Sequence, residues 1–157
     1  MNAKVEISSD GLAHWLPDEL LCENWINAAL ACANMQGDYV ISLRCVDESE
    51  SSAINQQYRG KKPATNVLSF PANVPNSMQS ILKFELLGDI VICPQVLALG
   101  ADSQGKSLEG HWAHMLVHGL LHLLGYDHES LEEAETMEKL EIKVLEKLGI
   151  SNPYLLV

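Results

Sequence analysis

The pattern of apolar and polar positions predicts that strands and helices alternate along the chain. Runs rich in β-branched, aromatic and other apolar residues indicate strands at 4–7, 39–46, 66–70 and 84–93, the first of them at a sheet edge. Helical spacing of apolar residues, with capping residues at the ends, indicates helices at about 17–34, 47–60, from 94 onward, 107–125 and 131–148. We expect one α/β (α+β) domain, residues 1–157, with a mixed sheet of about four strands packed with about five helices.

Length and composition agree with a single compact domain. The chain has 157 residues, of which 47% are hydrophobic, so it can bury a core without disulfides or other cross-links. The four cysteines lack C-x-x-C spacing and lie in apolar segments, which favours reduced, buried thiols. The first residues show no apolar leader and no segment is apolar for long enough to cross a membrane, so we expect a cytoplasmic protein without membrane contact.

Charge is distributed unevenly along the chain. The formal net charge of -11 argues against general nucleic-acid binding by a basic surface, so any contact with nucleic acid must be local. Arg59, Lys61 and Lys62 lie together in mid-sequence. The last predicted helix and the residues before it carry seven glutamates, interpreted as a solvated face opposite an apolar stripe: Glu129, Glu132, Glu133, Glu135, Glu138, Glu141 and Glu146.

The main candidate for chemistry is the segment 118–128, which reads HGLLHLLGYDH. Helical residues four apart project from one face, so His118 and His122 are placed to chelate a metal ion. Gly125 lets the chain reverse and bring His128 back as a third ligand. Three imidazoles favour one Zn²⁺ per chain, although other divalent metals bind such sites, and leave a coordination position for a water whose pKa zinc lowers to about 7. A hydrolytic centre is predicted.

The other histidines are interpreted as structural. His114 lies one turn before His118, and a straight helix cannot present it to the same ion, so we expect it to support a ligand or to pack. His14 and His111 have no companion at ligand spacing and are expected to be surface or capping groups.

The spacing of the three histidines is also that of the metzincin peptidases. Those enzymes need a glutamate directly after the first histidine as general base, and here that residue is Gly119. A peptide hydrolase stays open only if a carboxylate distant in sequence supplies the base. A metal-activated water paired with the cation Arg59 suits a phosphodiester better.

Three blocks of sequence resemble the YbeY family of bacterial metal-dependent endoribonucleases, also described as rRNA maturation factors and UPF0054 metalloproteins. Segment 118–128 is similar to the family signature His-Gly-x-Leu-His-Leu-x-Gly-Tyr-Asp-His. Segments 54–61 (INQQYRGK) and 65–71 (TNVLSFP) resemble its Asn-x-x-Tyr-Arg and Thr-Asp-Val-Leu-Ser-Phe-Pro, and 87–90 (LGDI) is a third match. Order and spacing agree over nearly the whole chain, and the resemblance implies that segment 118–128 lies on a zincin-like metal helix.

The resemblance implies a zinc-dependent, single-strand-specific endoribonuclease that acts in 3′-end maturation of small-subunit (16S) rRNA and in ribosome quality control. It implies that Arg59 and His118 are catalytic, that the three histidines hold zinc, and that the small ribosomal subunit and assembly factors such as the Era GTPase are partners, with DNA not expected. The chain departs from the family at Asn66, where aspartate is usual, and in the order of the loop at 61–64, which leaves the roles of Lys61 and Lys62 undecided.

Two other functions remain as alternatives. The first is a ribosome-assembly binding factor with a largely structural zinc ion, which an open coordination position would disfavour. The second is the zincin-like peptide hydrolase, which a glutamate within reach of the metal-bound water would favour.

Overall fold

The structure is a computed structural model that describes residues 2–9, 14–59, 67–72, 84–127 and 129–155. In this part of the chain four strands and five helices are present, as the apolar pattern predicts: β1 (Asn2–Ser9), α1 (Glu19–Cys32), β2 (Asp38–Cys45), α2 (Glu48–Arg59), β3 (Val67–Pro71), β4 (Glu85–Ile92), α4 (Pro94–Ser103), α5 (Leu108–Leu123) and α6 (Leu131–Lys147). Over the described residues, no helix has the length and apolar character needed to cross a membrane.

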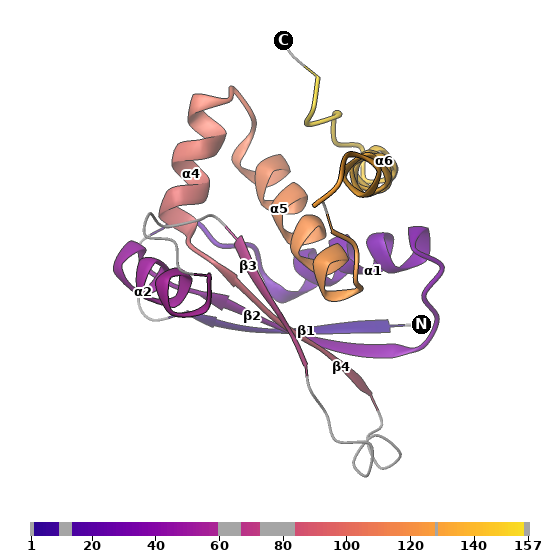
Figure 1. Cartoon of the computed structure of the whole chain (residues 1–157), viewed down its shortest axis with the longest axis horizontal. Helices are drawn as coiled ribbons and strands as arrows, with labels where there is room; N and C mark the ends of the chain where they lie inside the picture. Colours follow the sequence, from indigo (N-terminus) through magenta and orange to yellow (C-terminus); the bar gives the residue numbers. More distant parts are fainter. Residues whose placement is uncertain (1, 10–13, 60–66, 73–83, 128, 156–157) are drawn as a thin grey trace.

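The strands form one mixed sheet in the order β1-β2-β4-β3 (Figure 1). β1 pairs with β2 and β2 pairs with β4, both in parallel, whereas β3 runs antiparallel to β4. β1 lies at the edge of the sheet, as the sequence predicts. The α/β fold class and the mixed sheet are therefore confirmed, and α5 borders the antiparallel β3 as well as β4.

The two faces of the sheet carry cores of very different size. Ile90 and Ile92 point into the large core that also contains buried residues of α1, α5 and α6. Val91, between them on β4, belongs to a small cluster on the other face, where Ile54 of α2 packs. Figure 1 shows α5 over the sheet, between α4 and α6. Because α5 is enclosed by helices and sheet, its side chains are held in fixed directions.

A close approach between α5 and the sheet depends on Gly119. A Cβ atom at this position would lie 3.1 Å from Cγ2 of Ile90 and 3.2 Å from Oγ of Ser69. The Ser69 hydroxyl donates a hydrogen bond of 2.9 Å to the carbonyl oxygen of Gly119. Position 119 therefore faces β3 and β4, and a larger side chain here would have to push the helix away from the sheet.

The cysteines are all free thiols, as their spacing predicts. Cys22, Cys45 and Cys93 are buried, and Cys32 is half-buried. Burial raises the pKa of Cys22 and of Cys45 to about 12, so both remain protonated and unreactive at neutral pH.

His111 differs from its prediction as a surface or capping group. Its side chain is buried in α5 with a relative exposure of 2%, whereas His14 is exposed. Both ring nitrogens of His111 are buried without a hydrogen-bond partner among the described residues. Burial, together with the nearby positive charge of Lys106, lowers the pKa of His111 to about 4, so the ring is neutral in the folded protein at pH 7. The tight packing of α4 and α5 excludes it from water, which its sequence environment did not indicate.

This burial predicts a pH-dependent loss of stability. The unfolded chain takes up a proton at His111 below a pH of about 6.5, but the folded chain does so only near pH 4. As the pH is lowered from about 6.5 to about 4, the free energy of unfolding should therefore decrease, and His111 should account for about 3 kcal/mol of this decrease. Urea unfolding at several pH values should show a shallower pH dependence for His111→Leu than for the unmodified protein, and an unchanged one for His14→Leu. Equal slopes for all three proteins would contradict the assignment.

Candidate metal centre

Capping residues at both ends of α5 position the predicted ligands. The Ser107 hydroxyl accepts a hydrogen bond of 3.1 Å from the backbone N–H of Gly110, which fixes the first turn. At the other end Gly125 has a φ of +101°, and the N–H of Tyr126 donates to the carbonyl oxygen of Leu121 at 3.0 Å. This is the glycine-terminated helix end that the sequence predicts, and it directs the chain away from the helix axis.

His118 and His122 meet on one face of α5. Their rings are centred 4.6 Å apart at an interplanar angle of 84°, and the two Nε2 atoms are 3.1 Å apart. The helix spacing therefore produces the convergence that the sequence predicts for this pair.

Hydrogen bonds on the opposite side of each ring determine which nitrogen carries the proton. Nδ1 of His122 lies 3.0 Å from the carbonyl oxygen of Tyr126, which can only accept, so Nδ1 is the donor. Nδ1 of His118 lies 2.9 Å from Oε2 of Glu141 and donates to that carboxylate. In the neutral rings both Nε2 atoms then carry lone pairs that face each other. Two imidazole nitrogens in a tetrahedral zinc site, with bonds of about 2.0–2.1 Å, are separated by roughly 3.3 Å, close to the spacing found here.

The third predicted ligand, His128, lies outside the described residues. Among the residues that are described, no group of three histidine, cysteine, aspartate or glutamate side chains is arranged to hold a metal ion. The pair on α5 is thus the part of the predicted ligand set that can be placed, and the complete set stays a prediction.

Glu141 was predicted to lie on the solvated face of the last helix, and this prediction is wrong. Its relative exposure is 0%, although most other glutamates of that region are exposed. The residue lies on the buried side of α6, four positions after Met137 and three before Val144, both in the core. That position within the apolar stripe was the signal in the sequence: a charge placed among core positions needs partners inside the protein.

The partners of Glu141 are three donors from two segments, α5 and the C-terminal segment. Oε1 accepts hydrogen bonds from Nε2 of His114 and from the hydroxyl of Tyr154, both at 2.6 Å. Oε2 accepts from His118 at 2.9 Å. Burial by itself would raise the pKa of Glu141, but these hydrogen bonds outweigh it and hold the pKa at about 2, so the carboxylate is ionised at neutral pH. Burial and the adjacent carboxylate raise the pKa of Tyr154, which keeps its proton.

His114 has the supporting position that the sequence predicts. Nδ1 of its ring is buried and makes no hydrogen bond within the described residues, whereas Nε2 donates to Glu141. The ring thus braces the carboxylate that orients His118. Hydrogen-bonded carboxylates and carbonyls behind histidine ligands are the usual means by which proteins fix the tautomer and direction of a metal-binding imidazole.

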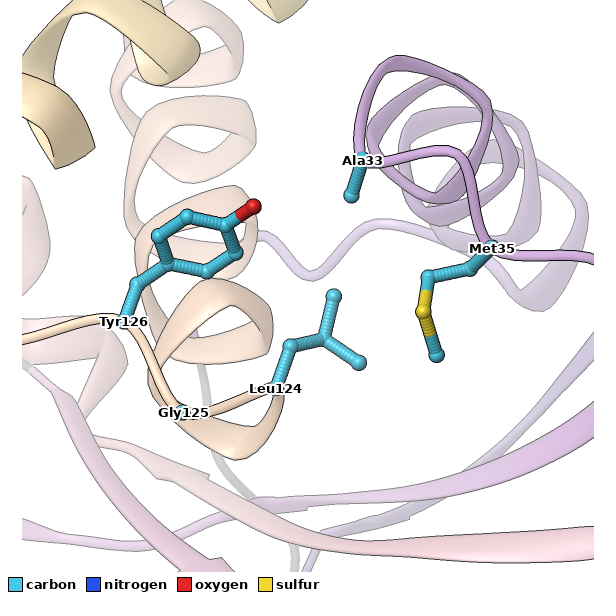
Figure 2. A pocket seen from close by; sticks show the side chains of 5 residues that line it. All are labelled: Ala33, Met35, Leu124, Gly125 and Tyr126. Carbon is cyan, nitrogen blue, oxygen red and sulfur yellow. The ribbon is translucent and has the colours of Figure 1, made fainter.

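The turn after α5 borders a hollow of about 270 Å³ between this turn and the end of α1. Figure 2 shows the side chains of Tyr126, Leu124 and Met35 around it, with Ala33 at the α1 side. The backbone of Tyr126 contacts His122 through its carbonyl oxygen, while its side chain faces the hollow. The loop that fixes the second histidine therefore faces the end of α1 across this hollow.

The remaining predicted site residues cannot be related to the histidines by distance. Arg59 is the last residue of α2, but the position of its side chain is not among those described. Lys61, Lys62 and Asn66 lie outside the described residues. Their participation in the site stays a prediction.

Comparisons with known proteins give a consistent result over most of the chain. The family model for Endoribonuclease YbeY matches residues 14–149. Proteins named Endoribonuclease YbeY are similar: one from Stenotrophomonas maltophilia is 51% identical over 139 residues (88% of this chain, 85% of the relative). Another, from Xylella fastidiosa, is 50% identical over 140 residues (89% and 86%). The solution structure of TM1509 from Thermotoga maritima has a TM-score of 0.55 at 28% identity, covering 92% of this chain and 91% of that one.

The role of Glu141 in holding the centre together can be tested by stability. We expect Glu141→Gln to lower the free energy of unfolding by about 2–3 kcal/mol at pH 7 without added metal, because a buried amide cannot accept all three charge-assisted hydrogen bonds. The matched control is Glu146→Gln, an exposed position on the same helix. Denaturant unfolding measures both, and equal stability of the two variants would show that the buried contacts contribute nothing.

Proposed function

Because the chain belongs to the endoribonuclease YbeY family, and is therefore a hydrolase that cleaves RNA, we propose that it cuts single-stranded RNA with one zinc ion held by His118, His122 and His128. The observation that supports the metal most directly is the 3.1 Å separation of the two Nε2 atoms on α5. With both Nδ1 atoms donating elsewhere, these lone pairs face each other, and either a proton shared as a hydrogen bond or a bound metal ion relieves their repulsion.

The residues around the pair suit a site that holds a metal ion in one orientation. Glu141 and the carbonyl oxygen of Tyr126 fix the two rings, and the negative charge of Glu141 makes His118 a stronger electron donor. A bound zinc ion would supply Lewis-acid polarisation and lower the pKa of a coordinated water. Arg59 would neutralise charge that builds on the phosphate oxygens during cleavage.

Local rather than general attraction would hold the RNA. With a net charge of -11, the protein repels a polyanion over most of its surface. The metal ion together with Arg59, and with Lys61 and Lys62 if they face the same cleft, would provide the positive potential at the reacting phosphate. The exposed glutamates of α6 stay in solvent, where they do not need to contact RNA.

The substrate that we propose is ribosomal RNA. In this proposal the enzyme acts in the cytoplasm on the 3′ end of small-subunit (16S) rRNA and in ribosome quality control, with the small ribosomal subunit and assembly factors such as the Era GTPase as partners. The support is the match of three sequence blocks and the family model over residues 14–149.

A peptidase function is not favoured by the structure. Gly119, at the position where a metzincin carries its base, faces Ile90 and Ser69 of the sheet. Glu141 approaches the Nδ1 side of His118, opposite to the Nε2 atom that would bind the metal. Glu141 is therefore placed to support a ligand rather than to act as the base.

Two substitutions separate the roles of metal and arginine. We expect His122→Ala to lose bound zinc and to reduce single-stranded RNA cleavage by more than about 10²-fold, because two ligands do not retain the ion. We expect Arg59→Ala to retain zinc and to cleave about 10²-fold more slowly, because only charge stabilisation is removed. Zinc content is measured by elemental analysis and cleavage with a labelled oligonucleotide.

The matched control for the arginine is Arg44→Ala, since Arg44 is exposed and pairs with Glu50 on the surface. This variant should keep both zinc and activity. Undiminished cleavage by metal-free His122→Ala would refute the zinc-dependent function, and equal activity of Arg59→Ala and Arg44→Ala would remove Arg59 from the mechanism.

A further inference from the structure

The residues after α6 place Tyr154 next to Glu141, the buried carboxylate behind His118. Gly149, with a φ of +78°, ends the helix, and the N–H of Ile150 donates to the carbonyl oxygen of Leu145 at 2.8 Å. The side chain of Ile150 packs against the large core. Four residues later, the hydroxyl of Tyr154 reaches Glu141. The described chain after α6 therefore stays close enough for the Tyr154 side chain to reach back to Glu141.

Tyr154 makes two kinds of contact with the hydrogen-bonded group behind His118. Its hydroxyl donates to Oε1 of Glu141 at 2.6 Å and lies 3.3 Å from Nε2 of His114. Its ring stands edge-on to the His114 ring, with centroids 5.4 Å apart and an interplanar angle of 84°. The backbone N–H of Tyr154 donates to Oδ1 of Asn152 at 2.8 Å, which holds the turn that presents the ring.

Tyr154 also separates the buried carboxylate from solvent. Its own relative exposure is 41%, whereas that of Glu141 is 0%. If the tyrosine left, water would gain access to Oε1, and the carboxylate would keep only the two histidine donors. A carboxylate that can rotate and hydrate holds Nδ1 of His118 less firmly, and the direction of Nε2 becomes less well defined.

We propose that Tyr154 is a positioning residue for the metal centre, and that docking of the C-terminal segment 151–155 onto Glu141 sets the affinity for the metal ion through the orientation of His118. This inference rests on the proposed zinc site. It couples two equilibria: docking of segment 151–155 and binding of the metal ion at α5. The docked segment tightens metal binding, and by thermodynamic linkage the bound metal ion must stabilise the docked segment by the same factor.

The first test compares two tyrosine variants that each lose one hydroxyl. Tyr154→Phe removes the contact to Glu141, and Tyr39→Phe removes a hydrogen bond of 2.7 Å to the carbonyl oxygen of Gln36, in the turn between α1 and β2. Zinc dissociation constants are measured by competition with a chelator. Outer partners of metal ligands typically change affinity by about 10–100-fold, so we expect roughly a 3–10-fold loss for Tyr154→Phe, one contact further out, and no change for Tyr39→Phe.

Two further readouts distinguish orientation of the ligand from general stability. The visible spectrum of the Co²⁺-loaded protein reports ligand geometry and should change in Tyr154→Phe but not in Tyr39→Phe. Amide hydrogen exchange of residues 151–155 in the unsubstituted chain should slow when zinc is added, by about the factor that the tyrosine hydroxyl contributes to binding. This last measurement needs no variant, so it holds even if Tyr154→Phe folds poorly.

Each outcome decides the proposal. Equal zinc affinities for Tyr154→Phe and the unsubstituted protein, or exchange of residues 151–155 that is unaffected by zinc, would overturn it and leave the proposed nuclease function intact. An equal loss in both tyrosine variants would also overturn it, because the effect would then be one of general stability. If the unsubstituted protein binds no zinc, the proposed zinc site itself fails, and the positioning role fails with it.

Discussion

The rest of the metal centre depends on the hydrogen bonds to the buried carboxylate of Glu141. An ionised group without exposure to water is strongly destabilising unless its oxygens receive hydrogen bonds, and here they receive them from α5 through His114 and His118 and from the C-terminal segment through Tyr154. The position of α6 against α5 is therefore fixed by polar geometry as well as by apolar packing. A displacement of either helix would leave a charge and two imidazoles without partners.

The opposite side of α5 is fixed in a different way. There Gly119 lets the helix lie directly on β3 and β4, and the Ser69 hydroxyl connects the strand to the helix backbone. The helix thus has a dry face of close contact and a face of hydrogen-bonded imidazoles. Gly119 stands where a metzincin has the glutamate that acts as its base, and the same glycine permits this close contact. One residue therefore accounts both for the chemical difference from a metzincin and for the packing of α5 on the sheet.

The sequence predicted what depends on local spacing. The ends of α5 follow from Ser107 and Gly125, and the convergence of the histidine pair follows from a separation of four residues. It did not predict the burial of Glu141, because glutamate is usually exposed, although its place among core positions of α6 was visible. The return of Tyr154 depends on the path of the chain after the last helix, which no periodicity encodes. The contributions of Arg59 and His128 remain predictions.

Because the exterior of the protein is acidic, the rate at which RNA encounters it depends on the salt concentration. Six exposed or half-exposed glutamates on and before α6 remain in solvent, while the seventh is buried and its charge is stabilised by its hydrogen-bond donors. Protein and RNA then approach as two polyanions, whose long-range repulsion is screened over about 8–10 Å at physiological ionic strength. Most nucleic-acid-binding proteins lose association rate as salt is added, because screening removes an attraction. For this protein we expect the same screening to remove a barrier, so that moderate salt favours the encounter with RNA.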